Sequence, residues 1–420
     1  MALLGASVGG CTSSVNRAAL YGDLPTLKQE IAERQAQGGL RRGRVEQLAW
    51  AVAGREVRST TGDLGVRRVA QMRPCAGHLG RVLRDRAERL DDAGAEAALV
   101  LLETNQLQPA PLVDRYHDAS SGAWRAVAAR AAVAPEHHRL RRRLIEDPDE
   151  RVRRNALYAA VESPSPDDLD ILLEAGRLDP DPQSRRLALR AVGGLGGERA
   201  VLALVDRWAR ADETERLAIV DAWASPAAYR AGGRDRLVWV VETTHGMPAV
   251  TAAAALAQGD GQARSLGVVR LTRALEHGTT EERRLAIQQA PVDDPDARRA
   301  IEAAAADENR QVRVMALARL LEVAPTETKY RDALRTLAKG DDPLAFQARA
   351  ALAAAQDDSI KETLLAELSA PRSFRRLLAA EGLVALGDYA GAATALGDDD
   401  PRVRASVACT VLASAEFPLR

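Results

Sequence analysis

The chain has 420 residues and a formal net charge of −1, with 58 Lys and Arg side chains against 59 Asp and Glu. Aromatic residues are only 3% of the chain, so the hydrophobic 46% is mostly Ala, Leu and Val, a composition that favours closely packed helices over sheets. The balanced charge lacks the basic excess typical of nucleic-acid-binding proteins, and no apolar run is long enough for a transmembrane helix.

The N-terminus reads MALLGASVGGCTSS, an apolar run of small residues that ends at Cys11 and a polar linker. It resembles a bacterial lipoprotein signal, with the lipobox Val8-Gly9-Gly10. The resemblance implies cleavage before Cys11 and acylation of this residue, residues 1–14 being signal and linker. The protein would then be anchored to a membrane, in the periplasm or at the cell surface. No Lys or Arg precedes the run, as one normally does in a signal. The alternatives are a start site further upstream or a glycine-rich tail on a cytoplasmic protein.

Residues 15–110 predict an atypical helical region that caps the rest of the chain. The segment NRAALYGDLPTLKQEIAE at 16–33 indicates a helix, a tight turn and a second helix, and RVEQLAWAVAG at 44–54 indicates another helix. Terminal units of repeat proteins are usually irregular because they shield the core. We therefore expect this region to pack onto the repeats that follow it.

From residue 111 to 420 one short phrase recurs. It reads DPDERVRRNAL at 147–157, DPDPQSRRLAL at 179–189, DENRQVRVMAL at 307–317 and DDDPRVRASVA at 398–408. With weaker copies it returns every roughly 31 residues, a period typical of solenoids. Such a unit holds two helices of about 11–12 residues and two turns.

The fixed offsets within the phrase predict a structural role. An Asp stands six residues before an Arg, at the expected start of a helix, where its carboxylate accepts free backbone N–H groups. The Arg is placed to reach back to this Asp or across to the turn of a neighbouring repeat. The predicted ladder consists of Asp147, Arg153, Asp179, Arg185, Arg283, Asp307, Arg313, Asp398 and Arg404.

This pattern resembles the HEAT-repeat family, including its short bacterial form related to phycobilin-lyase repeats. The resemblance implies an all-α, right-handed α-solenoid of antiparallel helix pairs, here about ten repeats over 111–420. It also implies that the second helices line a concave face, on which we expect a protein partner. The first interpretation is a non-enzymatic interaction scaffold. The alternatives are a lyase or other modifying-enzyme subunit, and a cytoplasmic DNA-binding or repair protein, which requires a continuous basic face.

We find no motif for catalysis in the sequence. The six histidines form no H-E-x-x-H, and no phosphate-binding loop or nucleophile elbow is present. Cys75 and Cys409 are too far apart for a metal knuckle and are interpreted as small or buried residues. We therefore expect no metal and no cofactor.

One basic segment, residues 137–154, is a candidate binding surface. The functional interpretation is a patch for an acidic partner or anionic lipid headgroups; the alternative is an ordinary solvated helix face that also serves the ladder. The predicted patch consists of Arg139, Arg141, Arg142, Arg143 and Arg154.

Overall fold

The computed structural model describes residues 14–415, and every regular element in them is helical. The chain forms two compact units: unit 1 combines Met1–Leu107 with Gln356–Arg420, and unit 2 is Gln108–Ala355. The sequence analysis placed the boundary between the helical capping region and the repeats at residue 110. The structure instead groups the helices after Gln356 with the N-terminal helices, because these two segments pack together.

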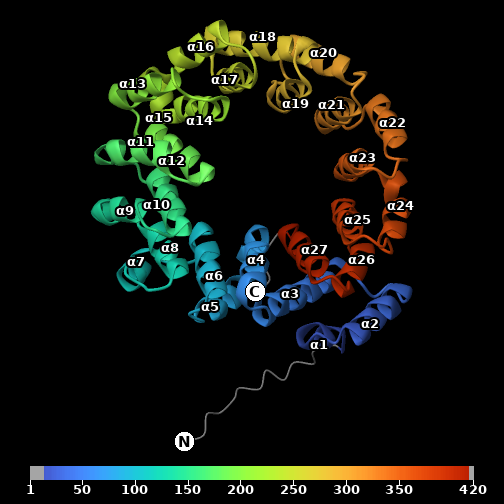
Figure 1. The fold of residues 1–420 in the computed structure, drawn as a ribbon. Helices are drawn as coiled ribbons and strands as arrows, with labels where there is room; N and C mark the ends of the chain where they lie inside the picture. The colour runs from blue at the N-terminus through green and yellow to red at the C-terminus, as the bar shows by residue number, and fades with distance from the viewer. Residues whose placement is uncertain (1–13, 416–420) are drawn as a thin grey trace, which may run out of the picture. The chain divides into compact units, whose positions relative to one another are not determined.

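Unit 2 is an α-solenoid of antiparallel helix pairs arranged in two rows (Figure 1). The outer row consists of α7 (Ala110–Tyr116), α9 (His138–Ile145), α11 (Leu169–Leu178), α13 (Gly197–Trp208), α16 (Arg234–Thr243), α18 (Gly261–His277), α20 (Pro295–Ala304) and α22 (Thr328–Leu337). The inner row, on the concave side of the unit, consists of α8 (Gly122–Ala131), α10 (Glu150–Glu162), α12 (Pro182–Leu195), α14 (Glu213–Ala224), α17 (Met247–Ala257), α19 (Thr280–Gln289), α21 (Arg310–Val323) and α23 (Pro343–Ala354). The short helix α15 (Pro226–Ala228) leads through a kinked turn, with Gly232 at φ 108°, into α16.

Small residues allow the helices of unit 2 to approach closely. The alanines three residues after the phrase Arg, Ala156, Ala188, Ala286 and Ala316, are fully buried. At Gly193 on α12 an added Cβ would lie 2.2 Å from the backbone oxygen of Ala222 on α14. The core is thus built from backbone-level contacts between neighbouring inner helices, which suits an Ala-rich composition.

Unit 1 is assembled from both ends of the described chain. Its N-terminal helices are α1 (Ser14–Tyr21), α2 (Leu24–Ala36), α3 (Arg42–Ser59), α4 (Gly62–Ala70), α5 (Ala76–Ala87) and α6 (Asp92–Glu103). Its C-terminal helices are α24 (Lys361–Glu367), α25 (Ser373–Ala385), α26 (Tyr389–Ala392) and α27 (Pro401–Ala413). The last helix, α27, packs along α3 and against the 3-10 turn Arg73–Cys75. Residues more than 300 positions apart therefore share one core.

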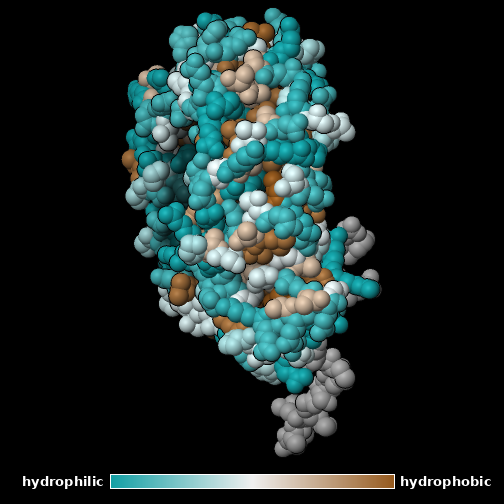
Figure 2. Space-filling model, turned by 90° about the vertical axis from the view of Figure 1, so that its right-hand side faces the viewer, coloured by the Kyte–Doolittle hydropathy of each residue, from teal (hydrophilic) through white to brown (hydrophobic). Residues whose placement is uncertain are grey.

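The face shown in Figure 2, which is the right-hand side of the view in Figure 1, is largely hydrophilic. Hydrophobic residues show there mainly in narrow furrows between helices. No described helix is both long and apolar enough to span a bilayer.

Candidate functional site

The phrase Arg has one repeated geometry with its own turn. Nη1 of Arg153 donates to the carbonyls of Asp147 and Pro148 at 2.9 and 3.1 Å, six and five residues earlier. The same two offsets recur at Arg125, Arg185, Arg313, Arg376 and Arg404. Each of these arginines thus satisfies two carbonyls of the turn that leads into its helix.

The other guanidinium nitrogens reach the carboxylate of the following repeat. Nε of Arg153 lies 2.8 Å from Asp179, and both side chains are largely buried. Equivalent pairs join Arg125 to Asp147 at 2.9 Å and Arg376 to Asp398 at 2.6 Å, while Arg283 lies 3.5 Å from Asp307. Arg376 holds a ladder position that the predicted set did not include, whereas its neighbour Arg375 pairs with Glu367. Arg185 makes the carbonyl bonds alone, because Arg210 stands where the next Asp would be.

The helix cap is made by the residue two positions after the ladder Asp. The Oδ atoms of Asp149, Asp181, Asn309 and Asp400 accept the first N–H groups of α10, α12, α21 and α27. The ladder Asp instead accepts the N–H of that capping residue, as Asp179 does from Asp181 at 2.9 Å. The expectation that the ladder Asp caps the helix directly is therefore corrected.

These bonds shift the titration of the carboxylates involved. Burial raises the pKa of Asp181, but hydrogen bonds from Ser184, Arg154 and two backbone N–H groups outweigh it and lower the pKa to about 2. Asp147 follows the same balance: burial raises its pKa, and the bonds from Arg125 and the Asp149 N–H bring it below the ordinary value. The charged form is thus favoured in the folded protein.

The five arginines of the predicted basic patch do not form a patch. Arg141 is completely buried, and its Nη2 lies 2.9 Å from the buried carboxylate of Asp168. Arg142 binds the carbonyl of Asp167, Arg143 pairs with Asp118, and Arg154 pairs with Asp181 and Glu150. Only Arg139 is exposed with no bond to another described side chain. Neighbouring residues of a helix point in different directions. The arginines of this segment are therefore divided between the protein interior and separate ion pairs, and they do not form one surface.

Cys75 and Cys409 form a disulfide, with their Cα atoms 5.3 Å apart, although they are 334 positions apart in sequence. Both are buried, at the end of the 3-10 turn Arg73–Cys75 and on α27. Sequence reasoning gave their burial but missed the bond. The available signal was arithmetic: if Cys11 is set aside as an acylation site, two cysteines remain to pair. Cys11 itself lies outside the described residues.

The inner face of unit 2 changes character along its length. Five residues after the phrase Arg, successive inner helices expose Tyr158 on α10, Arg190 on α12 and Asp221 on α14. The same register position carries Gln288 on α19 and Ala318 on α21. At this register position the face is therefore mixed in charge at one end and neutral at the other. It is not the continuous basic surface that the nucleic-acid alternative requires.

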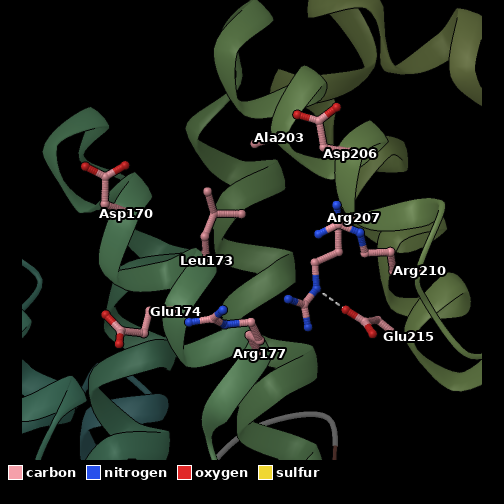
Figure 3. A pocket seen from close by; sticks show the side chains of 9 residues that line it. All are labelled: Asp170, Leu173, Glu174, Arg177, Ala203, Asp206, Arg207, Arg210 and Glu215. Atoms are coloured by element: carbon pink, nitrogen blue, oxygen red, sulfur yellow. Dashed lines mark hydrogen bonds and ion pairs between the residues drawn. The ribbon is translucent and has the colours of Figure 1, made fainter.

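Besides a groove of about 760 Å³ between α18 and α20, unit 2 has two grooves that are large enough to hold a side chain or a short peptide. The first, about 680 Å³, lies between α11 and α13, with charges of both signs along it (Figure 3). Its arginines are Arg177, Arg207 and Arg210, of which Arg207 bonds Glu215. The second, about 600 Å³, runs across α19, α21 and α23 and is more apolar, with Met315, Leu321 and Ala351 in its lining. In the described part of the chain no three His, Cys, Asp or Glu side chains are grouped as a metal site would need.

The comparisons with known proteins agree with the repeat interpretation over part of the chain. The model of HEAT repeats matches residues 138–224, which hold the pairs α9–α10 and α11–α12 and the next two helices. A crystal structure of an engineered protein is 19% identical, with 90% of this chain and 99% of that one covered, but its TM-score of 0.28 adds nothing to the fold assignment. No curated protein matches the chain. The repeats of unit 2 are thus similar to HEAT repeats over residues 138–224, which include the Arg153–Asp179 pair of the ladder.

Proposed function

We propose that this protein is a non-enzymatic scaffold that holds a protein partner on the inner face of its helix array. The main support is that the charged residues of unit 2 fall into two groups. Asp and Arg side chains of the turns form the ladder of ion pairs that joins successive repeats and holds the rows of helices. The inner face, in contrast, presents Tyr158, Arg190 and Gln288 to solvent. HEAT-type arrays bind protein partners over such extended surfaces.

A scaffold also accounts for the buried charges. Arg141 pairs with Asp168, and Arg404 pairs with Glu56, both in the interior. Buried ionisable groups are candidates for catalysis when they converge on a cavity. Here each pair joins two helices, and none belongs to the lining of any groove described above. These pairs serve the framework.

We further propose that the protein is exported and anchored through an acylated Cys11, at the periplasmic side of a bacterial membrane or on the cell surface. The disulfide between Cys75 and Cys409 supports this location, because disulfides persist mainly in oxidising compartments. The bond engages Cys75 and Cys409, two of the three cysteines of the sequence. A diacylated cysteine with a further acyl chain would give stable membrane attachment.

Intact-mass analysis and fractionation of the protein from its native cells test the location. Loss of the first ten residues with an added diacylglyceryl group, in the membrane fraction, would support it. A soluble chain that retains Met1 and an unmodified Cys11 would refute the anchor and leave the scaffold proposal standing.

The scaffold proposal is tested by site-specific photo-crosslinking. A benzophenone side chain at Gln288, on the inner face, should give a discrete crosslinked partner identified by mass spectrometry. The matched control is the same group at Val269 of α18, on the outer row and 65% exposed. Equal labelling at the two positions would contradict binding on the inner face.

A further inference from the structure

Two arginines on the inner face of unit 2 differ from the other arginines of the ladder region. Arg186 and Arg190 lie one turn apart on α12, and both are exposed. Among the described residues neither has a hydrogen bond or an ion pair, although both lie close enough to Asp221 on α14 for their charges to favour its ionised form. The ladder arginines beside them, Arg153 and Arg185, are in contrast fully engaged with the turns.

The surroundings of this pair are those of a binding surface. Tyr158, 43% exposed, occupies the position on α10 that Arg190 occupies on α12. Leu187 and Leu217 lie half-buried next to these residues on α12 and α14. Tyr and Arg beside apolar side chains make the composition of interface hot spots, because they combine large contact area with hydrogen-bonding capacity. Crowding by the neighbouring helices raises the pKa of Asp221 even though Arg190 and Arg186 lower it, so charges here are less well hydrated than on an open helix face.

We propose that Arg186 and Arg190, with Tyr158 beside them, bind an acidic segment of the protein partner. The proposal rests on the scaffold function and adds the chemistry of the partner. Positions four apart on a helix are separated by about 6 Å along its axis. This spacing matches two carboxylates on alternate residues of an extended segment, about 6.5–7 Å apart. Each guanidinium would take one carboxylate in a bidentate geometry, while the side chain of the residue between them would point away from this surface.

A protein segment fits this surface better than nucleic acid does. Asp221 lies on the same face and Glu162 at the end of α10 pairs with Arg130, so Arg186 and Arg190 alone are too few cations to follow a continuous phosphate backbone. Further along the row the equivalent positions are neutral, with Gln288 on α19 and Ala318 on α21. The cationic part is therefore short, as a local acidic motif requires.

The test is a titration of the full-length protein with a fluorescein-labelled peptide of alternating Glu and Ala, followed by fluorescence anisotropy. The same peptide with Gln in place of Glu is the ligand control, and a labelled oligothymidylate of equal length reports on nucleic acid. The variant is R186E/R190E. The matched control is R177E/R210E, which makes the same charge change on two exposed arginines of the groove between α11 and α13.

We expect R186E/R190E and the milder R186Q/R190Q to weaken binding of the Glu peptide about tenfold or more, and R177E/R210E to change it less than about twofold. The D221N variant should bind it more tightly. Equal weakening by the two charge-reversal variants, or tighter binding of the oligothymidylate than of the peptide, would overturn the proposal. A further experiment places benzophenone at Gln288 in the R186E/R190E variant. If this variant still captures the protein partner with unchanged yield, the acidic-segment inference fails and the scaffold function stands.

Discussion

Arg404 and Glu56 are 348 residues apart in sequence, yet Nη2 of the arginine lies 2.6 Å from the glutamate oxygen, with both side chains buried. Nη1 of the same guanidinium binds the carbonyls of Asp398 and Asp399, with the same two offsets as Arg125, Arg153, Arg185, Arg313 and Arg376. At Arg125, Arg153 and Arg376 the remaining nitrogens take an Asp from the following repeat. On the last helix that carboxylate comes from α3, so the ladder continues from the C-terminal helices into the N-terminal ones within unit 1.

The first prediction concerns this pair. The R404M variant leaves Glu56 buried without its partner, and we expect the free energy of unfolding to fall by about 3–5 kcal/mol. The double variant E56L/R404M removes both charges and should recover much of the loss. Urea denaturation followed by circular dichroism measures both. A double variant no more stable than R404M would show that the arginine contributes through its carbonyl bonds rather than through Glu56.

The second prediction concerns the disulfide. In C75S/C409S the unfolded chain is no longer closed into a loop of more than 300 residues, and we expect about 2–5 kcal/mol lower stability. The comparison is with C11S, which should not change the free energy of unfolding. Denaturation with and without a reducing agent checks this: the reductant should destabilise the wild type and C11S but not C75S/C409S. A wild type insensitive to reductant in the unfolded state would mean that the bond does not form.

The third prediction separates complete from incomplete ladder positions. Arg153 binds two carbonyls and Asp179, whereas Arg185 binds two carbonyls only. R153A should therefore cost about 2–4 kcal/mol, because it leaves a buried carboxylate unpaired, and R185A about 1–2 kcal/mol. Thermal unfolding of the two variants gives the comparison. Equal losses would show that the carbonyl bonds alone account for the stabilisation.

The fourth prediction is a pH dependence. The folded pKa of Asp181 is about 2, below that of an unfolded Asp at about 3.9. Its stabilisation is fully present above the unfolded pKa and is lost as the pH falls through about 4 towards 2. D181N keeps a capping side chain but removes the charge, so it should lose about 2 kcal/mol at pH 7 and little at pH 2. The control is D206N, which makes the same substitution at an exposed position in the groove between α11 and α13. Urea midpoints across this pH range decide it, and a constant difference at all pH values would refute it.

The fifth prediction follows from the placement of the basic segment. R141E puts a negative charge beside the buried Asp168 and should prevent stable folding, whereas R139E on the same helix should change the stability by less than about 0.5 kcal/mol. Soluble yield and circular dichroism distinguish them. Similar behaviour of the two variants would contradict the interior position of Arg141.

The sequence by itself determined the helical class and the repeat. The spacing of Asp147, Arg153 and Ala156 recurs because each repeat must start a helix, bind the carbonyls of the turn before it and pack closely against its neighbours. These requirements are local, so the amino-acid sequence alone reveals them. The same local logic placed the ladder residues near their observed partners, although it did not separate the capping Asp181 from the ladder Asp179.

Only the tertiary structure decided which distant residues meet. Cys75 pairs with Cys409 and Arg404 with Glu56 because the C-terminal helices pack onto the N-terminal ones, and no periodicity carries that information. The sequence also did not determine the environments of Arg139, Arg141 and Arg186. The first is exposed, the second is buried and the third is exposed without a partner, because different elements pack against each helix face. A repeat specifies its contacts with the next repeat, whereas the pairing of the two ends and the surface left for a partner depend on how all the helices are assembled.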